Sequence, residues 1–199
     1  MEIKGSSFKI RDLEPSDRYR LRKWADFDDP LLYGYNYSDM NEPELSFWYT
    51  SKVFPFRSKY FVAIDDNDHM FAYFGLKEIN RFTQTAKLGI VMDPRYVSKG
   101  LGTEIMILFL DYFFNRMKMN RMVLEVNEWN KRAIRLYEKL GFKYYDQYMQ
   151  KFENQTIDID DSKYDDIRDS FIEKGLFLYS RILKMSLYKE EYLGGKDAH

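Results

Sequence analysis

The stretch Lys87–Phe142, KLGIVMDPRYVSKGLGTEIMILFLDYFFNRMKMNRMVLEVNEWNKRAIRLYEKLGF, decides the fold because strand patterns and helix patterns alternate within it. The apolar run 88–92 predicts a strand that stops at Asp93-Pro94, since proline lacks an N–H and restricts the residue before it. The run 102–117 is apolar on nearly every side, which predicts a helix covered by a sheet and by other helices. We therefore expect a strand, a turn and a buried helix in direct succession.

The turn between them, Ser98-Lys99-Gly100-Leu101-Gly102-Thr103, contains two glycines. The first amides of a helix have no intrahelical acceptor, and the helix dipole favours negative charge beside them. Glycine also lets a ligand approach the backbone closely. The pattern predicts an anion site with N–H donors from 97–103 and a positive charge from Lys99. An ordinary strand-to-helix turn is the alternative reading of the two glycines by themselves.

A second strand and helix follow. Arg121–Asn127 has the composition of a strand, and the run from Asn130 to Leu140 has the spacing of an amphipathic helix that ends before Gly141. Its apolar face carries Ala133, Ile134, Tyr137 and Leu140.

The pattern Gly-x-Gly, strand, Asn130-x-x-Ala133-x-x-x-Tyr137-x-x-x-Gly141-Phe142 resembles the GNAT superfamily of N-acetyltransferases. These enzymes move an acetyl group from acetyl-CoA to an amine. The resemblance is specific over residues 60–145 and looser before them, and in layout it is closest to the ribosomal-protein and polyamine acetyltransferases. It implies an α/β (α+β) fold with one mixed, mostly antiparallel sheet of about six to seven strands flanked by about four to five helices.

The resemblance also implies which residues hold acetyl-CoA. The strand before the turn would splay from its neighbour and bind the pantetheine arm through its backbone, which maps to Ile90, Val91 and Met92. The turn would bind the diphosphate, and the second helix would contribute Asn130 and Ala133. The residues of the turn are Val97, Ser98, Lys99, Gly100, Leu101, Gly102 and Thr103.

Two positions in the turn depart from the family pattern. Val97 stands where the family usually has Gln or Arg, and Ser98 stands where glycine is common. Because such loops contact phosphate mainly through backbone N–H groups, we expect weaker binding rather than none.

Tyr137 falls at the family's general-acid position. Loss of coenzyme A creates a thiolate, and a phenol within hydrogen-bond reach can protonate that sulfur. Asn130 is expected to cap the same helix. A structural tyrosine on an amphipathic helix is the alternative, because the chain contains 17 tyrosines.

The amine acceptor must also lose a proton before it attacks. Only His69 and His199 could supply an imidazole, one in a turn and one at the terminus, so neither is a good candidate. Glu125 precedes the Asn130 helix as in the ribosomal-protein alanine N-acetyltransferases, where that glutamate acts as base. Glu78 is the competing candidate, and a salt-bridged strand glutamate is the structural alternative for both.

Composition limits the other classes of function. The chain has 31 basic and 32 acidic side chains, a formal net charge of −1 and no cysteine. The charge balance gives no reason to expect binding to nucleic acid or to an anionic membrane. The absence of cysteine excludes disulfides, thiolate-bound zinc and an acyl-cysteine intermediate. We expect transfer without a metal, either directly or through some other nucleophile. With no apolar signal segment at the N-terminus, a cytoplasmic location is expected.

We expect residues 1–199 to form a single N-acetyltransferase domain. Its parts are an N-terminal strand and substrate-side helices (1–59), the acetyl-CoA-binding core (60–145), and C-terminal strands with an acidic insert (146–190). An antiparallel meander of three strands is expected to precede the glycine turn. The other expected elements are a helix over 16–27, a tyrosine-rich loop over 31–41 bordering the substrate, a helix over 43–54, strands over 8–13, 144–152 and 176–188, a solvated helix over 164–173 and a frayed tail over 193–199.

The acceptor is expected to be a small cationic amine, a polyamine or a peptide N-terminus, and a homodimer is one possible assembly. The acidic residues Asp26, Asp28 and Asp29, and the insert 153–173, either form solvated faces or attract a cation. Two other functions stay open. A catalytically silent acyl-CoA-binding regulatory module is suggested by Val97 and Ser98, and a dinucleotide-dependent oxidoreductase by Gly100-x-Gly102, although Ile105 occupies its third glycine position.

Overall fold

The structure, a computed structural model, describes residues 1–196, and one nine-stranded sheet runs through it in the order β1-β2-β3-β4-β5-β6-β9-β7, with β8 paired to β9. The pair β5 and β6 is parallel, and the other neighbours are antiparallel. The strands are β1 (Glu2–Lys4), β2 (Phe8–Asp12), β3 (Lys59–Asp65), β4 (Met70–Asn80), β5 (Thr85–Met92), β6 (Arg121–Asn127), β7 (Lys143–Lys151), β8 (Phe171–Lys174) and β9 (Phe177–Tyr188).

The predicted fold class is confirmed, and so is the antiparallel meander, which is formed by β3, β4 and β5. The predicted number of strands was too low. β1 and β8 span three and four residues, too few for an alternating pattern to be recognised.

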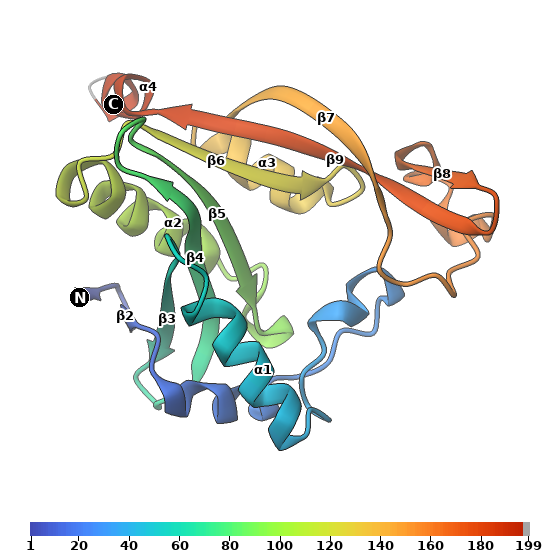
Figure 1. Cartoon of the computed structure of the whole chain (residues 1–199), viewed down its shortest axis with the longest axis horizontal. Helices are drawn as coiled ribbons and strands as arrows, with labels where there is room; N and C mark the ends of the chain where they lie inside the picture. The colour runs from blue at the N-terminus through green and yellow to red at the C-terminus, as the bar shows by residue number, and fades with distance from the viewer. Residues whose placement is uncertain (197–199) are drawn as a thin grey trace.

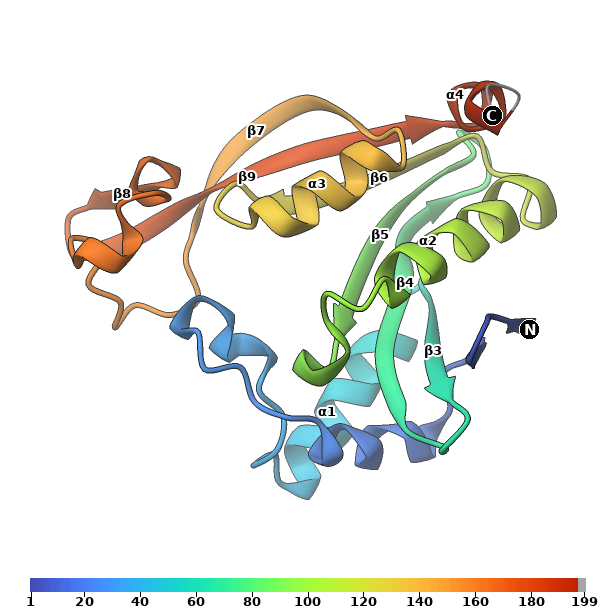
Figure 2. The ribbon, with the colours of Figure 1, turned by 180° about the vertical axis from the view of Figure 1, so that it is seen from behind.

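Helices cover both faces of the sheet. Figure 2 shows α2 and α3 together on the face turned to the viewer, with α1 on the other side. Phe109 of α2 packs its ring 5.1 Å from Phe61 and 5.0 Å from Phe74, so the main core lies between α2 and the meander. The α-helices are α1 (Glu42–Val53), α2 (Leu101–Asp111), α3 (Lys131–Lys139) and α4 (Lys189–Lys196).

The predicted helix over 16–27 is instead a 3-10 helix, Pro15–Lys23. The buried carboxylate of Asp17 accepts two hydrogen bonds from Arg11 and one from the N–H of Glu14. The pairing of Asp17 with Arg11, rather than the incomplete apolar stripe, therefore determines the structure of this segment. The expected loop after it contains a second 3-10 helix, Pro30–Tyr35, whose first turn is capped by Asp29.

The solvated helix expected over 164–173 was also wrong. Two 3-10 turns, Ser162–Tyr164 and Arg168–Ser170, lead into β8. Tyr164 and Phe171 are buried in a small cluster with residues of β9, because the insert folds back on the sheet.

Two helix ends differ from expectation. The α-helical part of the long apolar run ends at Asp111 and continues as a π-helical turn, Tyr112–Arg116, in which the N–H of Met117 donates to the carbonyl of Tyr112 at 2.9 Å. The frayed tail expected from Leu193 is helical up to Lys196, and residues 197–199 lie outside the described part.

Within residues 1–196, no helix has both the length and the apolar composition needed to cross a membrane. The same residues contain no cluster of three or more His, Cys, Asp or Glu side chains arranged to hold a metal ion.

Candidate active site

The parallel strands β5 and β6 separate halfway along their length. Their ladder joins Thr85 to Arg121 at one end and Leu88 to Leu124 at the other, and it stops there. On its other side, β5 stays paired with β4 as far as Met92. Figure 1 shows the two strands diverging from a shared end. The edge of β5 that faces β6 is therefore unpaired after Leu88, and an extended ligand could bind there as an additional strand.

Three of the predicted cofactor residues lie on this edge. Ile90 and Met92 pack against the main core, whereas Val91 packs against the cluster formed by the N-terminal segment and α1. Their side chains are therefore held by the protein, and the backbone is the part available to a ligand.

The turn that leads into α2 presents a row of backbone amides. Ser98 and Gly100 have φ angles of +63° and +81°, which turn the chain into the helix. Thr103 and Glu104 donate to the carbonyl of Gly100, but among the described residues the amides from Ser98 to Gly102 have no acceptor. These amides, which follow Val97 and include those of Lys99 and Leu101, can bind an anion at the positive end of α2.

Packing also favours glycine at position 102. A Cβ atom there would lie 3.0 Å from the sulfur of Met92, so a larger residue would displace the side chain beneath the helix start. Lys99 places its ammonium 5.3 Å from the ring centre of Tyr96, at the entrance to the turn. The residues present thus fit a diphosphate group bound mainly through the backbone.

A buried carboxylate fixes the start of this turn. Asp93 is 0% exposed and accepts hydrogen bonds from Arg95 at 2.7 Å and from His69 at 2.8 Å. Burial alone would raise the pKa of Asp93, but the hydrogen bonds from Arg95 and His69 hold that pKa below its ordinary value. Tyr96 donates to Asp65 at 2.6 Å, which ties the turn to the β3–β4 hairpin. The sequence predicted Asp93 only as the end of a strand, because its partner His69 is 24 positions away.

Asn130 and Tyr137 lie where the motif predicts. Asn130 caps α3 by accepting a hydrogen bond from the N–H of Ala133 at 3.1 Å. Tyr137, on the same helix, is 8% exposed, and the centre of its ring lies 5.8 Å from that of Phe142. Burial, with a smaller effect of Tyr35, raises the pKa of Tyr137 to about 12. The phenol is therefore protonated at neutral pH, and its hydroxyl makes no hydrogen bond to another described residue.

The two candidate bases share one lysine. The ammonium of Lys87 lies 2.6 Å from the carboxylate of Glu125 and 3.6 Å from that of Glu78. Glu125 is the first residue of β6 after the ladder to β5 ends, so it lies where the strands begin to separate. Glu78 is exposed, with a φ of +55°, at the irregular end of the β4–β5 pairing. The ion pair accounts structurally for both glutamates and leaves the role of base untested.

Beyond α3, a small cavity of about 50 Å³ lies between segments far apart in the sequence. It is lined by Tyr35, Asn127 and Asn130 and by Glu153 of the insert. Burial and the charge of Glu153 raise the pKa of Tyr35. The sequence analysis named the tyrosine-rich tract and the acidic insert, but it could not single out Tyr35 or Glu153 within them. Asp26 and Asp29 instead accept hydrogen bonds from their own neighbourhood, Ser38 and Leu31.

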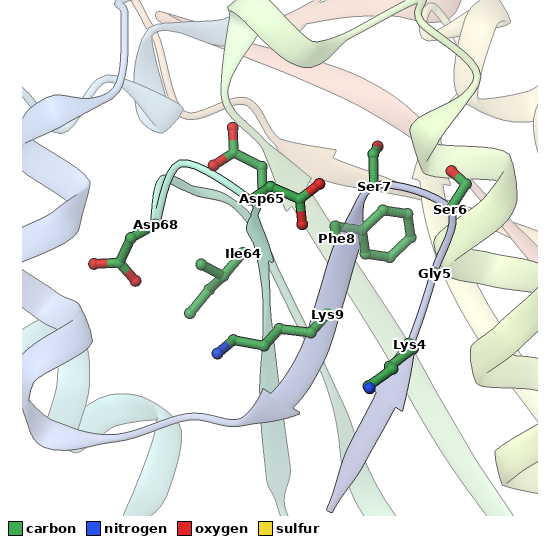
Figure 3. A pocket seen from close by; sticks show the side chains of 10 residues that line it. Lys4, Gly5, Ser6, Ser7, Phe8, Lys9, Ile64, Asp65 and Asp68 are labelled. Atoms are coloured by element: carbon green, nitrogen blue, oxygen red, sulfur yellow. The ribbon is translucent and has the colours of Figure 1, made fainter.

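A larger cavity, about 410 Å³, lies elsewhere, between the β1–β2 turn and the β3–β4 hairpin. Figure 3 shows Lys4 and Lys9 on the strands and Asp65 and Asp68 at the hairpin. Asp65 already accepts from Tyr96, and Asp68 pairs with Arg20. The cavity contains charges of both signs, and two of its carboxylates are already bonded, so it does not suit a polyanionic cofactor. The opening between β5 and β6 is the better candidate for the cofactor site.

Residues 18–142 match the model of the acetyltransferase (GNAT) family. A spermidine N(1)-acetyltransferase of Escherichia coli strain K12 is 29% identical over 146 residues, which cover 73% of this chain and 78% of the relative. A spermidine N(1)-acetyltransferase of Vibrio cholerae serotype O1 is 25% identical over 138 residues, 69% of this chain and 80% of the relative.

Solved structures have the same fold. The spermidine N-acetyltransferase of Vibrio cholerae in complex with CoA and spermine has a TM-score of 0.68 at 21% identity and covers 95% of this chain and 99% of its own. The predictions of an N-acetyltransferase and of acetyl-CoA as its acetyl donor are confirmed, and the oxidoreductase alternative is excluded. The chain belongs to the GNAT family of acetyltransferases.

Proposed function

We propose that this enzyme acetylates a primary amine of a polyamine, with Tyr137 as general acid. The acceptor class is suggested by the E. coli and Vibrio relatives, which are spermidine acetyltransferases and match this chain over 78% and 80% of their length. The observation that carries the proposal is the end of the β5–β6 ladder at Leu88 and Leu124, beside a helix start with unoccupied amides. A long, thin, anionic donor and an extended cationic acceptor suit such an opening between strands.

In this proposal the amides from Ser98 to Gly102 hold the diphosphate of acetyl-CoA, and the free edge of Gly89–Met92 holds its pantetheine arm. When bound, acetyl-CoA supplies the thioester. Tyr137 holds a proton on its phenol oxygen and donates it to the departing sulfur. The raised pKa of Tyr137 keeps the phenol protonated at neutral pH, so its O–H can hydrogen-bond the sulfur as charge develops there. The second proton that the amine nitrogen loses on becoming an amide then restores the phenol.

The acceptor ammonium loses its proton before attack. Glu125 is the proposed acceptor of this proton, directly or through water, because it lies where β5 and β6 separate. Its carboxylate lies 2.6 Å from the ammonium of Lys87, which holds the side chain at this position. Glu78, on the same lysine, is the competing base.

The test is an acceptor panel with acetyl-CoA, in which free thiol reports transfer. Spermidine, a short peptide with a free N-terminus and an aminoglycoside represent the three acceptor classes. The proposal expects the highest kcat/KM for spermidine. A preference for the peptide would correct the acceptor class, and no thiol release with any amine, despite a CoA-dependent rise in melting temperature, would support the silent regulatory module instead. The cytoplasmic location and the homodimer stay predictions.

A further inference from the structure

Glu153 lies where two distant segments meet. Leu31, in the 3-10 helix Pro30–Tyr35, packs in one buried cluster with Trp129 and Phe152. Asn154 donates a hydrogen bond to the carbonyl of Pro30 at 3.2 Å. Figures 1 and 2 both show the segment after β7 approaching this N-terminal segment. The packing on each side of Glu153 therefore fixes the position of its backbone.

The carboxylate of Glu153 lies directly against Gly34. A Cβ atom at position 34 would collide with Oε2 of Glu153 where this side chain lies, so a residue larger than glycine would make the carboxylate move. The side chain of Glu153 is thus directed toward the tyrosine-rich tract instead of away from the protein.

Among the side chains of residues 1–192, which the structure describes, no cation forms an ion pair with Glu153, and its carboxylate accepts no hydrogen bond. Two acids on the neighbouring elements are paired: Glu128 with Arg181 at 2.7 Å, and Asp146 with Lys184 at 2.8 Å. The nearby Lys151 places its ammonium over the ring of Phe177, 3.5 Å from the ring centre. One negative charge is therefore left without a partner at the cavity beside α3.

The cavity at Glu153 borders the start of the helix that carries Tyr137. Glu153 and Tyr35 line the same cavity as Asn130, the residue that caps the Tyr137 helix. The charge of Glu153 adds to burial in raising the pKa of Tyr35 and of Tyr37, and Tyr35 in turn contributes to the raised pKa of Tyr137. These effects indicate a row of polar groups within electrostatic range of one another.

We propose that Glu153, with the ring of Tyr35 beside it, binds a protonated amine of the acceptor other than the amine that is acetylated. This inference rests on the proposed function and assigns to Glu153 the choice of polyamines over monoamines. A carboxylate attracts an ammonium group by charge, and an aromatic ring adds a cation–π contact. Because Glu153 is exposed to solvent, the attraction is weak to moderate and decreases with salt.

The experiment compares spermidine with butylamine, a monoamine without a second cation, in the wild type and in Glu153→Gln. The variant should raise KM for spermidine about fivefold and change KM for butylamine by less than about twofold, with kcat for both nearly unchanged. Added salt should raise the spermidine KM of the wild type more than that of Glu153→Gln. Glu173→Gln, which removes an exposed acid from the same insert, is the matched control and should behave as the wild type.

Equal spermidine KM values for the wild type and Glu153→Gln would overturn the inference and leave the proposed function intact. If the wild type releases thiol with neither amine, the proposed function fails. The cation site at Glu153 is then tested by the melting temperatures of the CoA-bound wild type and of CoA-bound Glu153→Gln, each with and without spermidine. A spermidine-dependent rise that disappears in Glu153→Gln would support the cation site. No rise in the wild type, or the same rise in both proteins, would overturn it.

Discussion

The two sides of the site are built in different ways. The proposed cofactor region, Lys87–Phe142, is one continuous stretch that offers backbone amides and a strand edge. The proposed acceptor region, residues 31–37 together with 152–155, joins segments more than 100 positions apart and offers side chains, a carboxylate and phenols. Most of the first region packs on the main core. In the second region, Leu31 and Phe152 pack in a small separate cluster with Trp129, and Tyr35 and Tyr37 pack in the cluster around Trp24 and Trp48.

This difference explains which substitutions each side tolerates. Binding through backbone amides, as proposed for the cofactor, tolerates side chains such as Val97 and Ser98, because the donors do not depend on the side chain. Binding of an amine by the carboxylate of Glu153, as proposed above, would be lost with that one residue. We infer that the cofactor region keeps its function while its sequence varies, and that the acceptor region sets the specificity of each enzyme.

The largest expected effect comes from comparing a substitution in the main core with one in the small cluster around Trp129 and Phe152. Phe109→Ala removes a fully buried ring between Phe61 and Phe74 and should destabilise the whole domain by about 4 kcal/mol. Phe152→Ala, its counterpart in the small cluster, should destabilise less, keep the rise in melting temperature caused by CoA, and raise the amine KM. Urea unfolding and melting curves with CoA measure both. Equal losses of CoA binding in the two variants would show that the regions are not independent.

The next effect tests the chemistry. Tyr137→Phe removes the proposed acid and keeps the ring, so kcat should fall about a hundredfold, which corresponds to about 2.7 kcal/mol of activation energy. CoA binding should stay within about twofold, because the amides of the turn are untouched. Steady-state thiol release and titration calorimetry measure the two quantities, with Tyr33→Phe as a control on an exposed tyrosine. Unchanged turnover would remove Tyr137 from the mechanism.

A smaller effect belongs to the cofactor region alone. Gly100→Ala places a side chain at a φ of +81°, where nothing lies within 4 Å of its Cβ, so the cost is backbone strain of about 1 kcal/mol and not a clash. We expect CoA affinity to fall about fivefold and the spermidine KM at saturating acetyl-CoA to stay the same. A change confined to the spermidine KM would contradict the assignment of this turn to the cofactor.

The smallest effect concerns stability in alkali. Because the pKa of Tyr137 is raised to about 12 in the folded protein, its neutral form contributes stability that is complete below the unfolded pKa of about 10 and is lost as the pH rises toward 12. At pH 10.5 this loss is about 0.8 kcal/mol. Tyr137→Phe should therefore lose less stability than the wild type between pH 9 and pH 10.5 in urea unfolding. An equal loss in both would mean that the phenol is not buried in solution.

Much of the cofactor region could be predicted from the sequence. Proline after Asp93, the glycines at 100 and 102, and the cap at Asn130 act on their own neighbours, so their effects are visible in a short stretch. The helix over 16–27 and the one over 164–173 were predicted wrongly for the opposite reason. The buried pair of Arg11 and Asp17, and the pairing of β8 with β9, are tertiary interactions that override a weak local pattern.

The sequence alone determined the order of strand, turn and helix from Lys87 to Phe142, the burial of α2, and the place of Tyr137 on its amphipathic helix, because these depend on periodicity and on residues a few positions apart. Only the tertiary structure decided where β5 separates from β6, that Lys87 joins Glu78 to Glu125, and that Glu153 lies against Gly34. These features depend on which distant segments pack together, and packing is a property of the whole core that no local pattern records.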